Sequence, residues 1–208
     1  MENLIYILFI SVFVPIFLMA LLVEKKARLP ISFMLVGIFV SVFVAEINGL
    51  LRNFLPMDTF EFTSIVTPIT EEILKALPIL IYATMISDKK ESLFTAAMAT
   101  GIGFAVLENA FYLINDYSFN MIDAIIRAFG TGLMHGMCTL LVGVGISFAK
   151  KRKKIFAVGV FALLSTAITY HGIFNMLVQS SYEVAAFLLP IVTYTPFFIW
   201  RFKLKKKN

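Results

Sequence analysis

Residues 63–86 read TSIVTPITEEILKALPILIYATMI. The run is long enough to cross a bilayer as a helix, which takes about 20 apolar residues. Two adjacent carboxylates, Glu71 and Glu72, nevertheless lie in its middle, although each costs roughly a few kcal/mol or more in hydrocarbon. A membrane span keeps such residues only where they face a bundle interior, a partner or a wet cavity. The stretch therefore predicts a helix whose charged face is covered.

The whole chain has the composition of a membrane protein. Of its 208 residues, 60% are hydrophobic and 15% are charged, whereas a soluble domain is about half apolar and about a quarter charged. We expect an all-α, polytopic membrane helix bundle that forms one integral domain over residues 1–208, with a motif-bearing core at 63–178. The apolar runs predict seven spans, at 4–23, 31–51, 63–86, 93–115, 123–149, 155–178 and 184–200.

Basic residues are concentrated in every second loop. Loops 24–30, 87–92 and 150–154 and the C-terminal tail hold 15 of the 18 lysines and arginines, whereas the opposite loops hold only Arg52. Because cytoplasmic loops carry the excess of Lys and Arg, this pattern predicts an N-terminus outside and a C-terminus in the cytoplasm. The net charge of +5 is explained by these topology-determining loops. We therefore exclude nucleic acid as a partner.

Polar residues inside other predicted spans lie at a similar depth. At about 1.5 Å of rise per residue, Glu71, Glu72, Glu108, His135 and His171 lie roughly 11–18 Å below the outer end of their spans. Their similar depth predicts that these side chains form one buried centre in the outer half of the membrane. The alternative class is a proton- or cation-coupled transporter, but that function needs a polar path across the membrane, and no matching pair of interrupted spans marks an inverted repeat.

Helical spacing predicts which of these side chains act together. Lys75 follows Glu71 by four residues and Glu72 by three, so it can neutralise one carboxylate while the other faces a cavity. His171 and Asn175 are four residues apart and share a helix face, which suits a polarised carbonyl or a water. Gly101 and Gly103 predict a close approach of neighbouring helices.

Four motifs follow one another between residues 67 and 175: Glu71-Glu72-x-x-Lys75, Phe104-x-x-x-Glu108-Asn109, His135 in a glycine-rich span, and His171-Gly-x-x-Asn175. Together they resemble the PrsW family, membrane-embedded proteases that cleave anti-sigma factors. The resemblance implies a multi-pass protein of a prokaryotic cell membrane that takes part in a stress response. Its expected partners are the lipid bilayer and a single-span substrate such as an anti-sigma factor, cut near the extracytoplasmic side. CAAX-type prenyl endopeptidases and Abi-type immunity proteins belong to the same clan, so these two functions stay open as well.

We interpret the motif residues as a catalytic centre. One of Glu71 and Glu72 would activate a water as general base, while His171 and Asn175 orient the scissile carbonyl and stabilise the oxyanion. Glu108 and His135 would complete the centre. Glu108, His135 and His171 could supply three ligands to zinc, which is the expected cofactor. A metal-free glutamate mechanism is the alternative.

The charge pattern makes a topology prediction. Reporter fusions in loops 24–30, 87–92 and 150–154 and at the C-terminus should report the cytoplasm, because these segments carry nearly all of the loop lysines and arginines. The measurement is paired cytoplasmic and extracytoplasmic reporter activity. A C-terminal fusion active only outside the cell would contradict the orientation.

Overall fold

The computed structural model describes residues 4–87, 89–115, 121–149 and 156–205. The basic loop 150–154 and the last three residues therefore lie outside the described part. Within that part every element is a helix: α1 Leu4–Leu22, α2 Lys25–Phe54, α3 Thr59–Glu61, the π-helical turn η1 Phe62–Val66, α4 Thr67–Met85, α5 Lys90–Asn115, α6 Met121–Ala149, α7 Phe156–Val178 and α8 Glu183–Lys205. The expected all-α class is confirmed.

Each predicted span overlaps one long helix or, for 63–86, η1 and α4 together. The predicted loop 24–30 is wrong in its bounds, because α2 already begins at Lys25. Five helices are long and apolar enough to cross a membrane, namely α1, α2, α5, α6 and α7. α4 is not among the five because it carries three charged residues, while the apolar run of α8 extends from Val184 to Trp200. The number of crossings and their orientation stay predictions.

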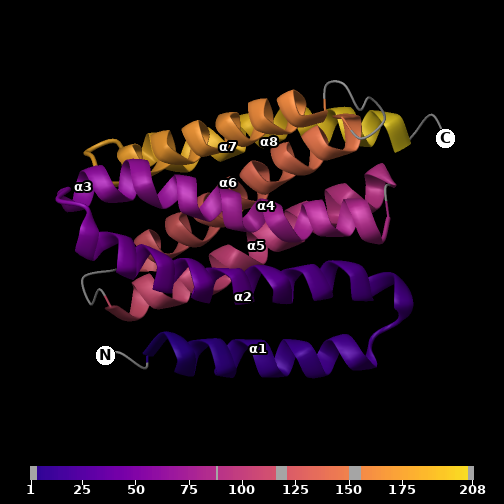
Figure 1. Cartoon of the computed structure of the whole chain (residues 1–208), viewed down its shortest axis with the longest axis horizontal. Coiled ribbons are helices and arrows are strands. Elements are labelled where there is room, and N and C mark those ends of the chain that lie inside the picture. Colours follow the sequence, from indigo (N-terminus) through magenta and orange to yellow (C-terminus); the bar gives the residue numbers. More distant parts are fainter. Residues whose placement is uncertain (1–3, 88, 116–120, 150–155, 206–208) are drawn as a thin grey trace.

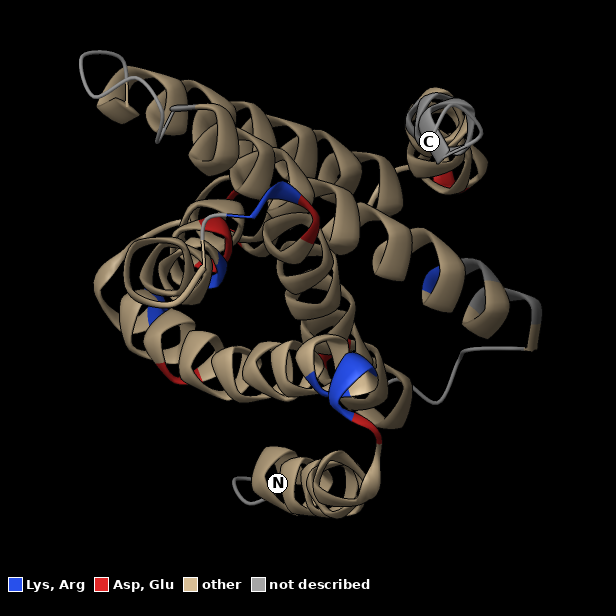
Figure 2. Ribbon diagram, turned by 90° about the vertical axis from the view of Figure 1, so that its right-hand side faces the viewer, with Lys and Arg blue, Asp and Glu red and all other residues tan. Residues whose placement is uncertain are grey.

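The long helices run back and forth along one axis, and the start of α1 and the end of α8 lie at opposite ends of that axis (Figure 1). α5 packs mainly against α2 and α6, while α7 contacts α4 and α6. α1 and α8 flank the bundle on opposite sides in both views, and most of the ribbon is uncharged (Figure 2). α4 packs against α2, α5, α6 and α7, so its charged face is covered as the sequence predicts.

The helical segment that leads into α4 is shaped by a cap on α3 and by a proline at the start of α4. Asp58 and Glu61 form a capping box, in which each side chain bonds the other's backbone N–H. Pro68 follows, and its missing N–H leaves a carbonyl of the preceding turn without a helical partner. In the π-helical turn that precedes it, the Thr67 N–H bonds the Phe62 carbonyl. A π-helical turn of this kind often marks a functional site.

Glycines bring the central helices close together, which confirms the close approach that the sequence predicts at Gly101 and Gly103. A Cβ on Gly103 would lie 2.1 Å from the Met34 carbonyl oxygen, and one on Gly101 would lie 2.2 Å from the His135 carbonyl oxygen. Gly37 meets the Thr100 carbonyl in the same way. These contacts join α5 to α2 on one side and to α6 on the other, which sets the distance between the helices that carry the site.

Two glycines of α2 offer a matched test of this packing. Gly37→Ala should destabilise the protein, by about 1–3 kcal/mol as overpacking usually does, because the added Cβ would lie 2.0 Å from a backbone oxygen. Gly49→Ala is the control, since no atom lies within 4 Å of its Cβ position. Thermal unfolding in detergent micelles measures both. Equal unfolding temperatures for the two variants would contradict the packing argument.

Candidate active site

α4 contributes three charged side chains that other helices bury. Glu72 and Lys75 are 0% exposed and Glu71 is 3% exposed. The Lys75 ammonium donates to Glu72 Oε1 at 2.6 Å and lies 3.6 Å from Glu71 Oε2. It also lies over the ring of Phe104, 4.5 Å from the ring centre. Lys75 is therefore paired closely with Glu72 and more loosely with Glu71.

His171 on α7 faces both carboxylates. Its Nδ1 lies 2.8 Å from Glu72 Oε1, and its Nε2 lies 3.9 Å from Glu71 Oε2. Because an ionised carboxylate only accepts hydrogen bonds, a neutral His171 must donate from Nδ1. The lone pair on Nε2 is then directed toward the Glu71 side of the cluster.

His135 on α6 closes the cluster from another side. Its Nδ1 lies 2.7 Å from the Lys75 ammonium, which can only donate, so Nδ1 accepts. The proton of the ring is then on Nε2, which donates to Glu108 Oε2 at 2.7 Å. The ring also packs edge-on against His171, with 4.9 Å between ring centres. Both histidines are essentially buried.

Four of the predicted residues come together as one cluster. Donor atoms of Glu71, Glu72, His135 and His171 all lie within 4.8 Å of one another. Glu108, which the sequence suggested as a ligand beside the two histidines, is not one of the four. It contacts the far nitrogen of His135 instead.

The donor set of this cluster fits a divalent metal. Glu71 Oε2 lies 3.8 Å from His135 Nδ1 and 3.9 Å from His171 Nε2, whereas ligands about 2.0–2.2 Å from zinc would lie roughly 3.3–3.6 Å apart. The other nitrogen of each ring is bonded to a carboxylate, a pattern usual for metal-binding histidines. Glu71 Oε2 is also buried without a hydrogen-bond partner, which a cation would supply.

Asn175 lies one helical turn from His171 but has a partner of its own. Its amide donates to the Thr63 carbonyl at 2.9 Å. In the π-helical register this carbonyl would pair with the N–H that Pro68 lacks, so Asn175 supplies the missing donor. Gln179, one turn further, bonds the Thr63 hydroxyl. Asn175 thus holds the turn that leads into Glu71.

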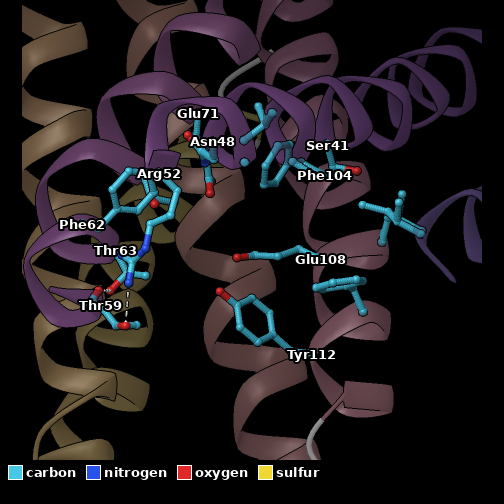
Figure 3. Close-up of a pocket in the computed structure, with 17 residues that line it drawn as sticks. Ser41, Asn48, Arg52, Thr59, Phe62, Thr63, Glu71, Phe104, Glu108 and Tyr112 are labelled. Atoms are coloured by element: carbon cyan, nitrogen blue, oxygen red, sulfur yellow. Dashed lines mark hydrogen bonds between the residues drawn. The ribbon is translucent and has the colours of Figure 1, made fainter. Parts of the chain in front are cut away.

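Among the described residues, one cavity reaches the cluster at Glu71, and a second reaches Glu108 beside it. The larger, about 560 Å³, lies among α2, η1, α4 and α5, and both Glu71 and Glu108 line it (Figure 3). The smaller, about 200 Å³, has a more polar lining that includes Glu108, Arg127, Asn175 and Gln179. Both are lined by Thr59, Thr63 and Thr67. Glu108 therefore has access to both spaces.

The three threonines that line both cavities were not identified from the sequence. Thr59, Thr63 and Thr67 precede Glu71 at intervals of four residues, which places them on one helix face. That spacing is a readable signal of a polar face leading to a carboxylate. Arg127 and Tyr112, whose side chains stack at 4.0 Å, carry no comparable signal, because their meeting depends on how α5 and α6 pack.

Comparison with known proteins agrees with the motif resemblance. A family model described as "PrsW family intramembrane metalloprotease" matches residues 25–201. No curated protein matches the chain, and no solved structure matches it. The match spans every residue of the buried cluster and both cavities except Ile5. The chain belongs to the PrsW family of intramembrane metalloproteases, and it is a multi-pass membrane protein with peptidase activity.

Proposed function

We propose that this peptidase hydrolyses a single-span membrane protein, such as an anti-sigma factor, close to the extracytoplasmic face of the cell membrane. The observation that carries the proposal is the convergence of Glu71 Oε2 with His135 Nδ1 and His171 Nε2 within 3.9 Å, beside a cavity that Glu71 lines. The common depth of the motif residues below the predicted outer boundary supports an extracytoplasmic cut.

In this proposal the two adjacent glutamates have different roles. Glu72 accepts from both Lys75 and His171, so it orients the imidazole and balances the buried ammonium. Glu71 lines the larger cavity and holds the attacking water together with His171, whose Nε2 faces it. A zinc ion held by Glu71, His135 and His171 would lower the pKa of its bound water to about 7 and polarise the scissile carbonyl.

Glu108 is suited to move the proton. Its side chain is 19% exposed, lines both cavities and accepts from His135. It can receive a proton from the attacking water and return it to the amine of the departing chain, as a general base and acid. The smaller polar cavity is the proposed route for water, since hydrolysis consumes one water in each turnover.

Lys75 supplies a positive charge beside this centre. Its ammonium occupies the lone pair of His135 Nδ1, so a metal bound at that nitrogen would take the place of the lysine hydrogen bond. The pair with Glu72 would remain. Lys75 is thus the counter-charge that lets two neighbouring carboxylates stay buried.

The two glutamates should respond differently to removal of charge. Glu71→Gln should lower the cleavage rate by about 10²–10⁴ with little change in unfolding temperature, because Glu71 has only a loose contact with Lys75. Glu72→Gln should be inactive and also destabilised, by about 3–5 kcal/mol, since it leaves the Lys75 ammonium buried without its closest anion.

Cleavage of a reconstituted single-span anti-sigma factor and thermal unfolding of the same samples measure these effects. His171→Ala should match Glu71→Gln in activity, because it removes the second group that faces the water. Full cleavage by all three variants would refute the assignment of this cluster. An equal loss of stability in both glutamine variants would refute the division of roles.

Metal analysis separates the proposed ligands from their hydrogen-bond partners. Wild-type protein should hold about one zinc per chain, lost in the double variant His135→Ala, His171→Ala and in Glu71→Ala. Glu108→Gln should keep zinc with roughly 10–100-fold weaker affinity, because Glu108 contacts only the far nitrogen of His135. Zinc retained in Glu71→Ala but lost in Glu108→Gln would favour the ligand set expected from the sequence. Full activity without metal would favour the glutamate mechanism.

A further inference from the structure

The larger cavity has a positive charge on one wall and the carboxylates of the centre on another. Arg52, at the end of α2, lines it together with Thr59 and Phe62. Glu71 and Glu108 line the same space from α4 and α5 (Figure 3). A substrate segment that reaches Glu71 through this cavity would therefore come within reach of Arg52.

The size of the cavity limits what can enter. One turn of α-helix, 5.4 Å high and about 10–12 Å wide, fills roughly 420–610 Å³, close to the 560 Å³ of this space. About four substrate residues would fit, whereas a complete span is about 30 Å long. The substrate must then present a short segment, either unwound or at the end of its membrane helix.

Part of the lining can bond such a segment. Asn48 uses its side-chain oxygen to accept from the Thr70 hydroxyl at 2.7 Å, and its NH₂ group has no partner among the described residues. Ser41, Thr63 and Thr67 add hydroxyl groups to the wall. An unwound peptide needs such groups, because its free backbone N–H and C=O groups are costly to bury unpaired.

Arg52 has no carboxylate partner in the described part of the chain. Its guanidinium donates to the Asp58 carbonyl at 3.2 Å and the Thr59 hydroxyl at 2.7 Å, and it lies over the Phe62 ring. The acidic side chains nearby are engaged elsewhere: Asp58 and Glu61 cap α3, and Glu46 accepts from Tyr6. These two hydrogen bonds use only two of the five guanidinium N–H groups, so the fork can still bind an anion.

We propose that the larger cavity binds a short segment of the substrate and that Arg52 selects an acidic side chain a few residues from the scissile bond. The inference rests on the proposed function, because it takes the cluster at Glu71 as the site of cleavage. The charges of the cavity wall favour a segment with an acidic side chain, because a substrate carboxylate is attracted to Arg52 and repelled by Glu71 and Glu108. An acidic residue should therefore determine which peptide bond of the segment lies beside Glu71, as well as how tightly the segment binds.

Quenched fluorescent peptides test the inference with purified full-length protein in detergent micelles. A single Asp is moved along an otherwise uncharged ten-residue peptide, and matched series carry Asn or Lys at the same positions. At one position the wild type should cleave the Asp peptide with a kcat/KM about tenfold or more above the Asn peptide, as a charge-assisted hydrogen bond would produce. Arg52→Glu should prefer Lys there, and Arg52→Lys should keep a weaker preference for Asp.

Arg28→Glu is the matched control, because Arg28 also donates to a backbone carbonyl, that of Val23, and does not line the cavity. It should keep the wild-type profile. Arg52→Gln, which should lose the preference altogether, covers the case that Arg52→Glu does not fold. Thermal unfolding identifies that case.

Four outcomes would overturn the inference. The wild type could cleave the Asp and Asn series equally or cleave none of the Asp peptides. Arg52→Glu could keep the Asp preference. Alternatively, Arg52→Glu could slow all peptides equally, and only when phospholipid is present, which would mean that the arginine binds lipid phosphate. Failure of the proposed function looks different, because Glu71→Gln would then cleave the peptides as fast as the wild type.

Discussion

The structure depends on one buried ammonium. Lys75 is fully buried and contacts Glu72, Glu71 and His135, which come from two helices. Without it, two neighbouring carboxylates would have to lie unpaired in a low-dielectric interior, at a cost of several kcal/mol for each charge. The same contacts determine which nitrogen of His135 carries the proton, and so let this ring bond Glu108. A single cation thereby orders the cluster and links it to the carboxylate that lines both cavities.

A second constraint fixes where α4 begins. Pro68 removes a backbone donor from the turn before Glu71, and Asn175 on α7 provides the donor that Thr63 needs. Gly172 permits this approach, since a Cβ there would lie 2.8 Å from the Ser64 carbonyl oxygen. The motif around His171 therefore has two tasks. Its histidine reaches the cluster, while its glycine and asparagine hold the π-helical turn against α7.

Proteolysis inside a membrane requires both water and substrate at a site that lipid would otherwise surround. The two cavities differ in their linings, and each suits one of these two requirements. The small space has several hydrogen-bonding walls and suits water, whereas the larger one mixes apolar side chains with a few polar groups, as sites for organic ligands usually do. The threonine row at positions 59, 63 and 67 lines both cavities, so the helix face that leads to Glu71 borders the proposed water route and the proposed substrate site.

The sequence by itself determined the all-helical class, the position of each long helix to within about six residues and four of the polar residues that meet, Glu71, Glu72, His135 and His171. Apolar runs and helical spacing are local properties, and a carboxylate in hydrocarbon must have a partner wherever the chain folds. Only the tertiary structure decided the pairings. Glu71 and Glu72 are about 100° apart on one helix, so the rotation of α4 against α6 and α7 decides which of them bonds His171 and which faces the cavity. The packing of α7 against η1 turns Asn175 toward a backbone carbonyl, and the packing of α5 against α6 places Glu108 behind His135. The spacing within a single helix cannot determine contacts of this kind.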